Sequence, residues 1–138
     1  MTLGYMLSTK FRTIKEPKNY PMDQHHKINY IELHSKDISA TKNFYQQVFG
    51  WTFVDYGPDY IAVEGAHLDG GFYKANLSSK ALQGAALVVL YSNQLEESLQ
   101  QVKNHGGQIV KEIFSFPGGR RFEFEDPTGN HLAVWSQH

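Results

Sequence analysis

The amino-acid sequence predicts an α+β fold made of two β-α-β-β-β half-modules, which form a curved, barrel-like mixed sheet with both helices on its convex side. Alternating apolar residues mark the strands, and apolar residues three and four apart mark one helix in each half. The order of elements also repeats at a constant spacing. Asp37 and Asn93, the expected first caps of the two helices, lie 56 residues apart, as do Gly50 and Gly106 at their ends.

The first half begins with a strand over residues 28–34. Two-residue alternation divides its side chains between two faces: Asn29, Ile31 and Leu33 on one, and Tyr30, Glu32 and His34 on the other. A helix over 39–49 follows, with Asp37 or Ser39 as its first cap and Gly50 at its end. Three short strands complete this half, over residues 51–56, 60–64 and 71–74.

The second half has the same order of elements. A strongly apolar strand over 84–91 precedes a helix over 94–105, which Ser92 or Asn93 caps. The last three strands are expected at residues 108–114, 120–125 and 130–136. In the final strand, alternation puts His131, Ala133 and Trp135 on one face and turns Leu132 and Val134 toward the helices.

Composition excludes several classes of protein. The 138 residues suffice for one ordinary domain, and a net charge of −1 argues against nucleic acid or an anionic membrane as a partner. The absence of cysteine excludes disulfides, thiolate zinc sites and cysteine nucleophiles. No apolar run approaches the roughly 20 residues of a membrane span, and residues 1–21 do not have the pattern of a secretory signal. We therefore expect a cytoplasmic protein.

The first 26 residues differ from the rest of the chain. They contain two prolines and mixed charges without a helical period, and they are expected to be an N-terminal extension, an arm or an extra strand. Another interpretation is that Met22 is the natural start. The domain itself is expected over residues 27–138.

Three segments carry a resemblance to a known family. They are residues 30–51, with the helix that ends in Phe-Gly-Trp; residues 99–107; and residues 118–135, with the turn Asp126-Pro-Thr-Gly-Asn130. On these segments, residues 27–137 resemble one module of the vicinal oxygen chelate superfamily. That superfamily includes glyoxalase I, extradiol dioxygenases, and fosfomycin- and bleomycin-resistance proteins. For a single-module member, the resemblance implies a homodimer. It does not fix the function, because this scaffold supports isomerases, dioxygenases, thiol transferases and drug binders.

The resemblance also implies where a metal would bind. Metal enzymes of this superfamily use His, Glu or Gln from equivalent strand positions in each half, with coordination positions left open for substrate. Here those positions hold Tyr30, Ala86, Ala133 and the stretch 71–73, none of which offers an imidazole or a carboxylate. We therefore expect no metal and no other cofactor. The chain does contain donors for an improvised site: Glu32, His34, His67, Glu123 and His131.

The ligand-binding residues are expected to be those that the resemblance places on the concave face: Tyr30, Glu32, His34, His131 and Trp135. They would line an aromatic cleft that suits an aromatic or heteroaromatic ligand with a cationic or hydrogen-bonding group. In a second interpretation, the aromatic side chains only fill the concavity or a dimer interface. Glu32, His34 and His131 are the candidates for acid–base catalysis, as a Glu32–His34 or a Glu32–His131 pair.

The favoured function is a metal-free small-molecule-binding module that acts as a homodimer. The alternative is a metal-dependent lyase, isomerase or dioxygenase with non-standard ligands. As an enzyme, the protein would be a glyoxalase I-like lyase or isomerase, or an extradiol-type dioxygenase. A third possibility is an interaction module that binds no ligand.

Overall fold

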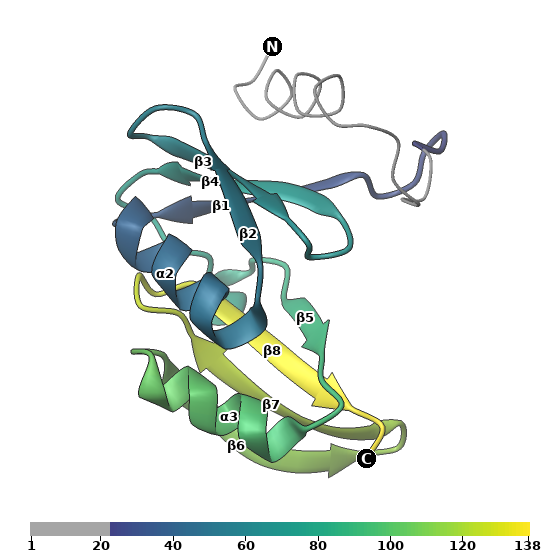
Figure 1. Ribbon diagram of the computed structural model, residues 1–138. Coiled ribbons are helices and arrows are strands. Elements are labelled where there is room, and N and C mark those ends of the chain that lie inside the picture. The colour runs from purple at the N-terminus through teal and green to yellow at the C-terminus, as the bar shows by residue number, and fades with distance from the viewer. Residues whose placement is uncertain (1–22) are drawn as a thin grey trace.

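The computed structural model describes residues 23–138 (Figure 1). The predicted extension, arm or extra strand over residues 1–26 falls almost entirely in residues 1–22, which lie outside the described part. In the described part, no helix is long and apolar enough to cross a membrane.

Strands and helices follow the predicted order along the chain. The first half contains β1 (Tyr30–Ser35), α2 (Ile38–Phe49), β2 (Thr52–Asp55), β3 (Tyr60–Glu64) and β4 (Asp69–Lys74). The second half contains β5 (Val88–Tyr91), α3 (Leu95–Asn104), β6 (Gln108–Phe116), β7 (Gly119–Glu125) and β8 (His131–Ser136). A short 3-10 turn, η1 (Ala81–Gln83), joins the halves and was not predicted.

The strands form two four-stranded mixed sheets with the same topology. The first sheet has the order β1-β4-β3-β2 and the second the order β5-β8-β7-β6. In each sheet the first strand runs parallel to the last strand of its half, and the other pairs are antiparallel. The predicted α+β class is confirmed, and the eight strands of the described residues form two separate sheets rather than a closed barrel.

Both ends of helix α2 follow the predicted capping signals. The Asp37 carboxylate accepts a 3.1 Å hydrogen bond from the Ala40 N–H, which satisfies one of the free donors at the helix start. At the other end Gly50 adopts the left-handed conformation, with φ of 71°, which glycine reaches at little cost. The helix therefore begins and ends where the sequence predicts, and it buries Thr41, Phe44 and Tyr45.

Helix α3 and strand β5 correct two predicted boundaries. The cap position of α3 is Gln94 rather than Ser92 or Asn93, and its side chain makes no capping hydrogen bond; the Ser92 hydroxyl accepts from the Gln94 N–H at 2.9 Å and is hydrogen-bonded to the Ser98 hydroxyl at 2.7 Å. Strand β5 is also shorter than predicted. Gly84 has a φ of 95° and ends the 3-10 turn, so extended backbone begins only after it.

A shared hydrophobic core lies between the two sheets. Helix α2 packs on the first sheet (Figure 1). It also contacts the second sheet, with 5.9 Å between the ring centroids of Phe44 and Phe124. The Tyr45 hydroxyl donates to the buried Asp126 carboxylate at 2.9 Å. The largest core side chains come from both halves: Phe44, Tyr45, Ile61, Phe72, Leu95, Phe122, Phe124 and Leu132. Each sheet thus has one face on this core and one face turned away from it, which we call its outer face.

Candidate functional site

The outer face of the first sheet carries the predicted residues of β1. Leu33 packs against the shared core, so alternation turns Tyr30, Glu32 and His34 the opposite way, as predicted. On this face the Tyr30 hydroxyl meets that of buried Tyr60, which lies on β3, beyond β4. Polar and aromatic groups thus gather on a sheet surface that does not pack against the shared core.

A chain of hydrogen bonds links two tyrosines and a glutamate on this face. The Tyr60 hydroxyl lies 3.0 Å from the Glu32 Oε2 atom, and the hydroxyls of Tyr30 and Tyr60 are hydrogen-bonded to each other. Gly71 makes this arrangement possible: a Cβ atom there would lie 2.8 Å from the Tyr30 Oη atom and closer still to that of Tyr60. The two phenols therefore meet above a position where no side chain fits.

Both phenols of this chain are harder to ionise than a free tyrosine. Burial raises the pKa of Tyr30, and the nearby negative charges of Glu32 and Asp69 add to that rise. Burial also raises the pKa of Tyr60, and the adjacent Tyr30 and Glu32 add to that rise. Both hydroxyls thus keep their protons near neutral pH.

His34 has a partner of its own on the same face. Its Nε2 atom lies 2.6 Å from the Tyr73 hydroxyl, and the two rings meet edge to face with 4.6 Å between centroids. His34 on β1 and Tyr73 on β4 occupy paired register positions. The histidine ring is therefore held in place by a neighbouring strand.

On the outer face of the second sheet, His131 belongs to a short polar chain. The His131 Nε2 atom lies 3.0 Å from one carboxylate oxygen of Glu123, and an Arg121 Nη2 atom donates to the other at 2.8 Å. Glu123 stands opposite Ala133 in the β7–β8 register. A carboxylate thus lies beside the alanine position, although it is already engaged on both sides.

Trp135 lies in an aromatic row on this second outer face. Its ring centroid is 4.9 Å from that of Tyr91 and 6.2 Å from that of Phe116. Phe114 extends the row, with the Arg121 guanidinium 5.3 Å from its ring centroid. This arrangement offers flat apolar surface next to charged groups.

The five predicted site residues therefore lie in two groups. Tyr30, Glu32 and His34 are on the first sheet, and His131 and Trp135 are on the second. Among the described residues, Glu32 is hydrogen-bonded to Tyr60, whereas His34 bonds Tyr73 and His131 bonds Glu123. Neither of the predicted glutamate–histidine pairs is thus a hydrogen-bonded pair within this chain.

Sequence reasoning missed the residues that neighbouring strands contribute. Tyr60, Tyr73, Tyr91 and Phe116 all contact predicted site residues, yet none was singled out. Tyr60, Tyr73 and Tyr91 do belong to predicted strands, whereas Phe116 lies beyond the predicted end of its strand at residue 114, because β6 extends to Phe116. What was lacking is the register between strands, which decides which side chains are neighbours.

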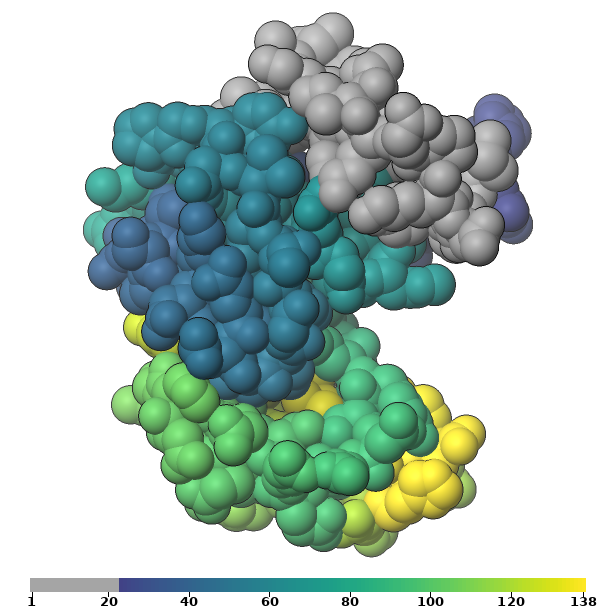
Figure 2. Space-filling model, viewed as in Figure 1, coloured from purple at the N-terminus to yellow at the C-terminus, as the bar shows by residue number. Residues whose placement is uncertain are grey.

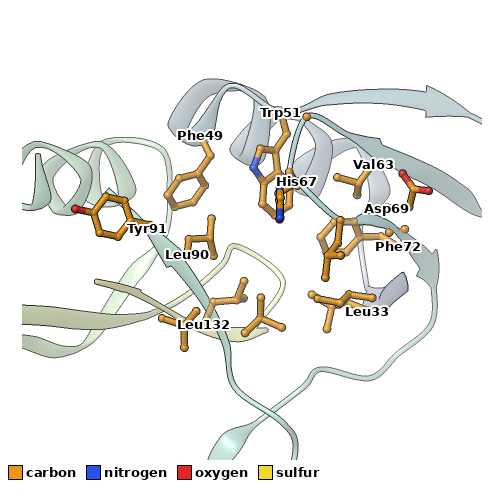
Figure 3. Close-up of a pocket in the computed structure, with 18 residues that line it drawn as sticks. Leu33, Phe49, Trp51, Val63, His67, Asp69, Phe72, Leu90, Tyr91 and Leu132 are labelled. Carbon is orange, nitrogen blue, oxygen red and sulfur yellow. The ribbon is translucent and has the colours of Figure 1, made fainter. Parts of the chain in front are cut away.

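A cavity of about 580 Å³ opens on the core side of the molecule, between the two sheets (Figure 3). Figure 2 shows the molecule hollowed between α2 and β5, with part of the yellow C-terminal region visible beneath. The lining is mostly apolar: Ile31, Leu33, Phe49, Trp51, Val63, Phe72, Val88, Leu90 and Leu132. His67 lies at this cavity with a φ of 80°, an uncommon conformation for a residue other than glycine. The cavity is separated by the first sheet from the Tyr30–Tyr60–Glu32 chain.

The donors at the expected metal positions do not fit a divalent metal. Ala86 and Ala133 have no side-chain donor, and the raised pKa of Tyr30 disfavours the phenolate that would bind a cation. Among residues 23–138, no group of three or more His, Asp or Glu side chains is placed to hold a metal ion. The five candidate donors for an improvised site, which all lie in this part of the chain, thus do not gather around one point. Two of them, Glu123 and His131, are hydrogen-bonded to each other.

Curated relatives at low identity have glyoxalase-type names. The chain is 28% identical over 123 residues to the CFP32 proteins of Mycobacterium tuberculosis and Mycobacterium bovis, which carry a glyoxylase name. The match covers 78% of this chain and 44% of each relative. The chain therefore spans less than half the length of these relatives.

The chain also matches solved structures with the same fold, and each match covers most of the solved chain's length. A glyoxalase/bleomycin resistance protein/dioxygenase family enzyme from Burkholderia phytofirmans gives a TM-score of 0.67 at 16% identity, over 80% of this chain and 98% of the other. A glyoxalase-related enzyme from Fulvimarina pelagi gives 0.63 at 21% identity, over 81% and 88%. A lactoylglutathione lyase from Agrobacterium tumefaciens gives 0.61 at 17% identity, over 83% and 96%.

The family model with the description Glyoxalase/Bleomycin resistance protein/Dioxygenase superfamily matches residues 27–134, which is most of the chain. Its limits agree with the two half-modules that the strands and helices define. With this match, and with the paired sheets and two helices of residues 23–138, the chain belongs to the glyoxalase/bleomycin resistance protein/dioxygenase superfamily.

Proposed function

We propose that the protein binds a small aromatic or heteroaromatic molecule on its outer sheet faces, without a metal. One observation carries this proposal: both outer faces hold aromatic side chains beside hydrogen-bonded polar groups, although neither face belongs to the shared core. Flat rings with a few fixed polar groups are the usual lining of small-molecule sites. The ligand residues remain those predicted: Tyr30, Glu32, His34, His131 and Trp135.

A homodimer would join the two groups of site residues. Strands β1 and β5 lie at the ends of their sheets, and the apolar cavity opens beside both of them. We propose that two copies meet along these edges, so that the second copy covers the cavity. The first sheet of one copy would then face the second sheet of its partner across one cleft. An interface of this kind is expected to bury on the order of 1,000 Å² or more.

Two valines of equal size and similar exposure test the dimer. Val89 on β5 is 43% exposed and Val110 on β6, at the other end of the same sheet, is 46% exposed. We expect Val89→Arg to yield monomers in sedimentation equilibrium at micromolar concentration, and Val110→Arg to leave the dimer intact. A wild-type protein that sediments only as a monomer would contradict the proposal.

The two tryptophans test where the ligand binds. Trp135 lies on the outer face of β8, whereas Trp51 lines the cavity. In Trp51→Phe the only tryptophan is Trp135, and in Trp135→Phe it is Trp51. Titration of the ¹⁵N-labelled variants with unlabelled indole and quinoline is expected to shift the side-chain N–H NMR signal of Trp135 and leave that of Trp51 unchanged. A response from Trp51 alone would move the ligand to the cavity and reject the outer-face site.

We also propose that the protein acts in the cytoplasm and has neither nucleic acid nor a membrane as a partner. It is supported by the near-neutral net charge of −1.

A further inference from the structure

The direction of the hydrogen bonds on the first outer face limits what can bind there. An ionised Glu32 only accepts, so the single Tyr60 hydroxyl proton points to its Oε2 atom. The Tyr60 oxygen must then accept from Tyr30, whose own proton is used in that bond. The chain therefore ends in acceptors: the remaining lone pair of the Tyr30 hydroxyl and the second oxygen of Glu32.

Burial places these two acceptors within reach of a ligand and keeps the middle of the chain covered. Tyr60 is fully buried, Tyr30 is half-buried and Glu32 is exposed. Because position 71 has no Cβ, which would strike both phenol oxygens, the phenols lie close against the sheet and hydrogen-bond to each other. The acceptor pair is thus held by the fold itself.

The chain of hydrogen bonds itself carries a negative charge. With both phenols neutral, this charge lies on Glu32. His34, which lies on the same face, is engaged with the Tyr73 hydroxyl. A ligand group that meets this surface should donate several hydrogen bonds and carry a positive charge.

We propose that the outer face of the first sheet recognises a protonated primary amine that carries an aromatic ring. The ammonium group donates to Glu32 and to the Tyr30 hydroxyl, and its charge also faces the tyrosine rings. The ring of the ligand lies along the edge-to-face pair of His34 and Tyr73. This inference rests on the proposed function, since it names the ligand class for one of its two groups of site residues.

A matched pair of ligands tests the inference. 2-Phenylethylamine is protonated at neutral pH, and 2-phenylethanol has the same ring and chain without the charge. Binding of both is measured on the wild-type protein by isothermal titration and by changes in amide NMR signals. We expect the amine to bind about tenfold more tightly than the alcohol, since a hydrogen bond donated by a charged group to a carboxylate is stronger than one donated by a neutral hydroxyl.

Two variants locate the effect. Glu32→Gln keeps an oxygen that accepts from Tyr60 but removes the charge, so it should reduce the affinity for the amine about tenfold and leave that for the alcohol unchanged. The control Glu112→Gln, at an exposed site on β6, should change neither.

Other outcomes of these experiments would contradict either the inference alone or the proposed function as well. Equal affinities for the amine and the alcohol, unchanged in Glu32→Gln, would overturn the inference and leave the proposed aromatic-ligand function standing. If neither compound binds, and indole and quinoline also leave Trp135 unchanged, the proposed function fails and the inference fails with it.

Discussion

The side-chain amide of Asn130 donates a 2.7 Å hydrogen bond to the backbone carbonyl of His34, which ties the start of the last strand to the first strand. Asn130 is fully buried, and its side-chain oxygen accepts from the Ser79 N–H at 2.9 Å. One side chain thus connects the first sheet, the second sheet and the segment between them. These two hydrogen bonds explain why an asparagine follows the Asp-Pro-Thr-Gly turn.

Replacing this asparagine should destabilise the whole domain. Asn130→Ala would leave the His34 carbonyl and the Ser79 N–H without their partner, at a cost of about 3 kcal/mol or more in the free energy of unfolding. Urea unfolding followed by circular dichroism measures this loss. The control Asn104→Ala, at the exposed end of α3, should cost far less. A loss below about 1 kcal/mol for Asn130→Ala would reject the role given to this tie.

A methyl group at Gly71 should disrupt the tyrosine pair. Gly71→Ala would bring its Cβ against the hydroxyls of Tyr30 and Tyr60, and we expect a loss of about 1–3 kcal/mol in stability. Thermal or urea unfolding measures it. Gly118→Ala is the matched control, because its Cβ would meet only the edge of the Phe116 ring, at 3.1 Å. Equal stability of the two variants would contradict the packing described for Gly71.

Asp126 should make the stability depend on pH in a defined direction. Burial raises the pKa of Asp126 above its ordinary value of 3.8, so the folded state takes up this proton more readily than the unfolded state. Its contribution to stability is therefore greatest below pH 3.8 and decreases as the pH rises through the folded-state pKa. We expect the free energy of unfolding of the wild type, minus that of Asp126→Asn, to be more positive at pH 4 than at pH 7.

Tyr45 provides the companion test for this pH dependence. Its hydroxyl donates to Asp126 and opposes the rise in the pKa of that carboxyl. Tyr45→Phe should therefore raise the pKa further and widen the pH range over which stability changes. A pH profile that Tyr45→Phe leaves unchanged would show that this hydrogen bond does not tune Asp126.

Metal analysis tests the prediction of a metal-free site. Protein purified without a histidine tag should contain no stoichiometric zinc, nickel, manganese or iron, because Tyr30 and Ala133 replace the expected donors. Addition of these ions should also leave the thermal midpoint unchanged. A stoichiometric metal whose removal lowers that midpoint would overturn the prediction.

The fold was predictable because its signals are local. Alternation in β1, the Asp37 cap and the Gly50 end each act within a few residues, and all three recur in the structure. The start of α3 was less well predicted. The cap position there is Gln94, whose side chain makes no capping hydrogen bond, so none of the residue types that usually mark a helix start stands at that position.

The arrangement of the candidate site depended on information that one sequence does not contain. Alternation correctly put Tyr30, Glu32 and His34 on one face of β1. It could not say that Tyr60 lies under Tyr30, since this depends on the register between strands. Nor could it say that His131 and Trp135 lie on a different sheet from the β1 residues, since this depends on how the two half-modules pack.

The position of β8 in the second sheet has a consequence for folding during synthesis. Although it is the last strand of the chain, it lies inside the sheet, between β5 and β7. The first sheet can complete its pairing once Lys74 has left the ribosome, whereas β5 must wait for the C-terminal strand. Apolar Val88 and Leu90 stay without their partner strand until then, which exposes the nascent chain to aggregation. Truncation of the last few residues should thus impair the yield of folded protein more than an equal loss from an edge strand.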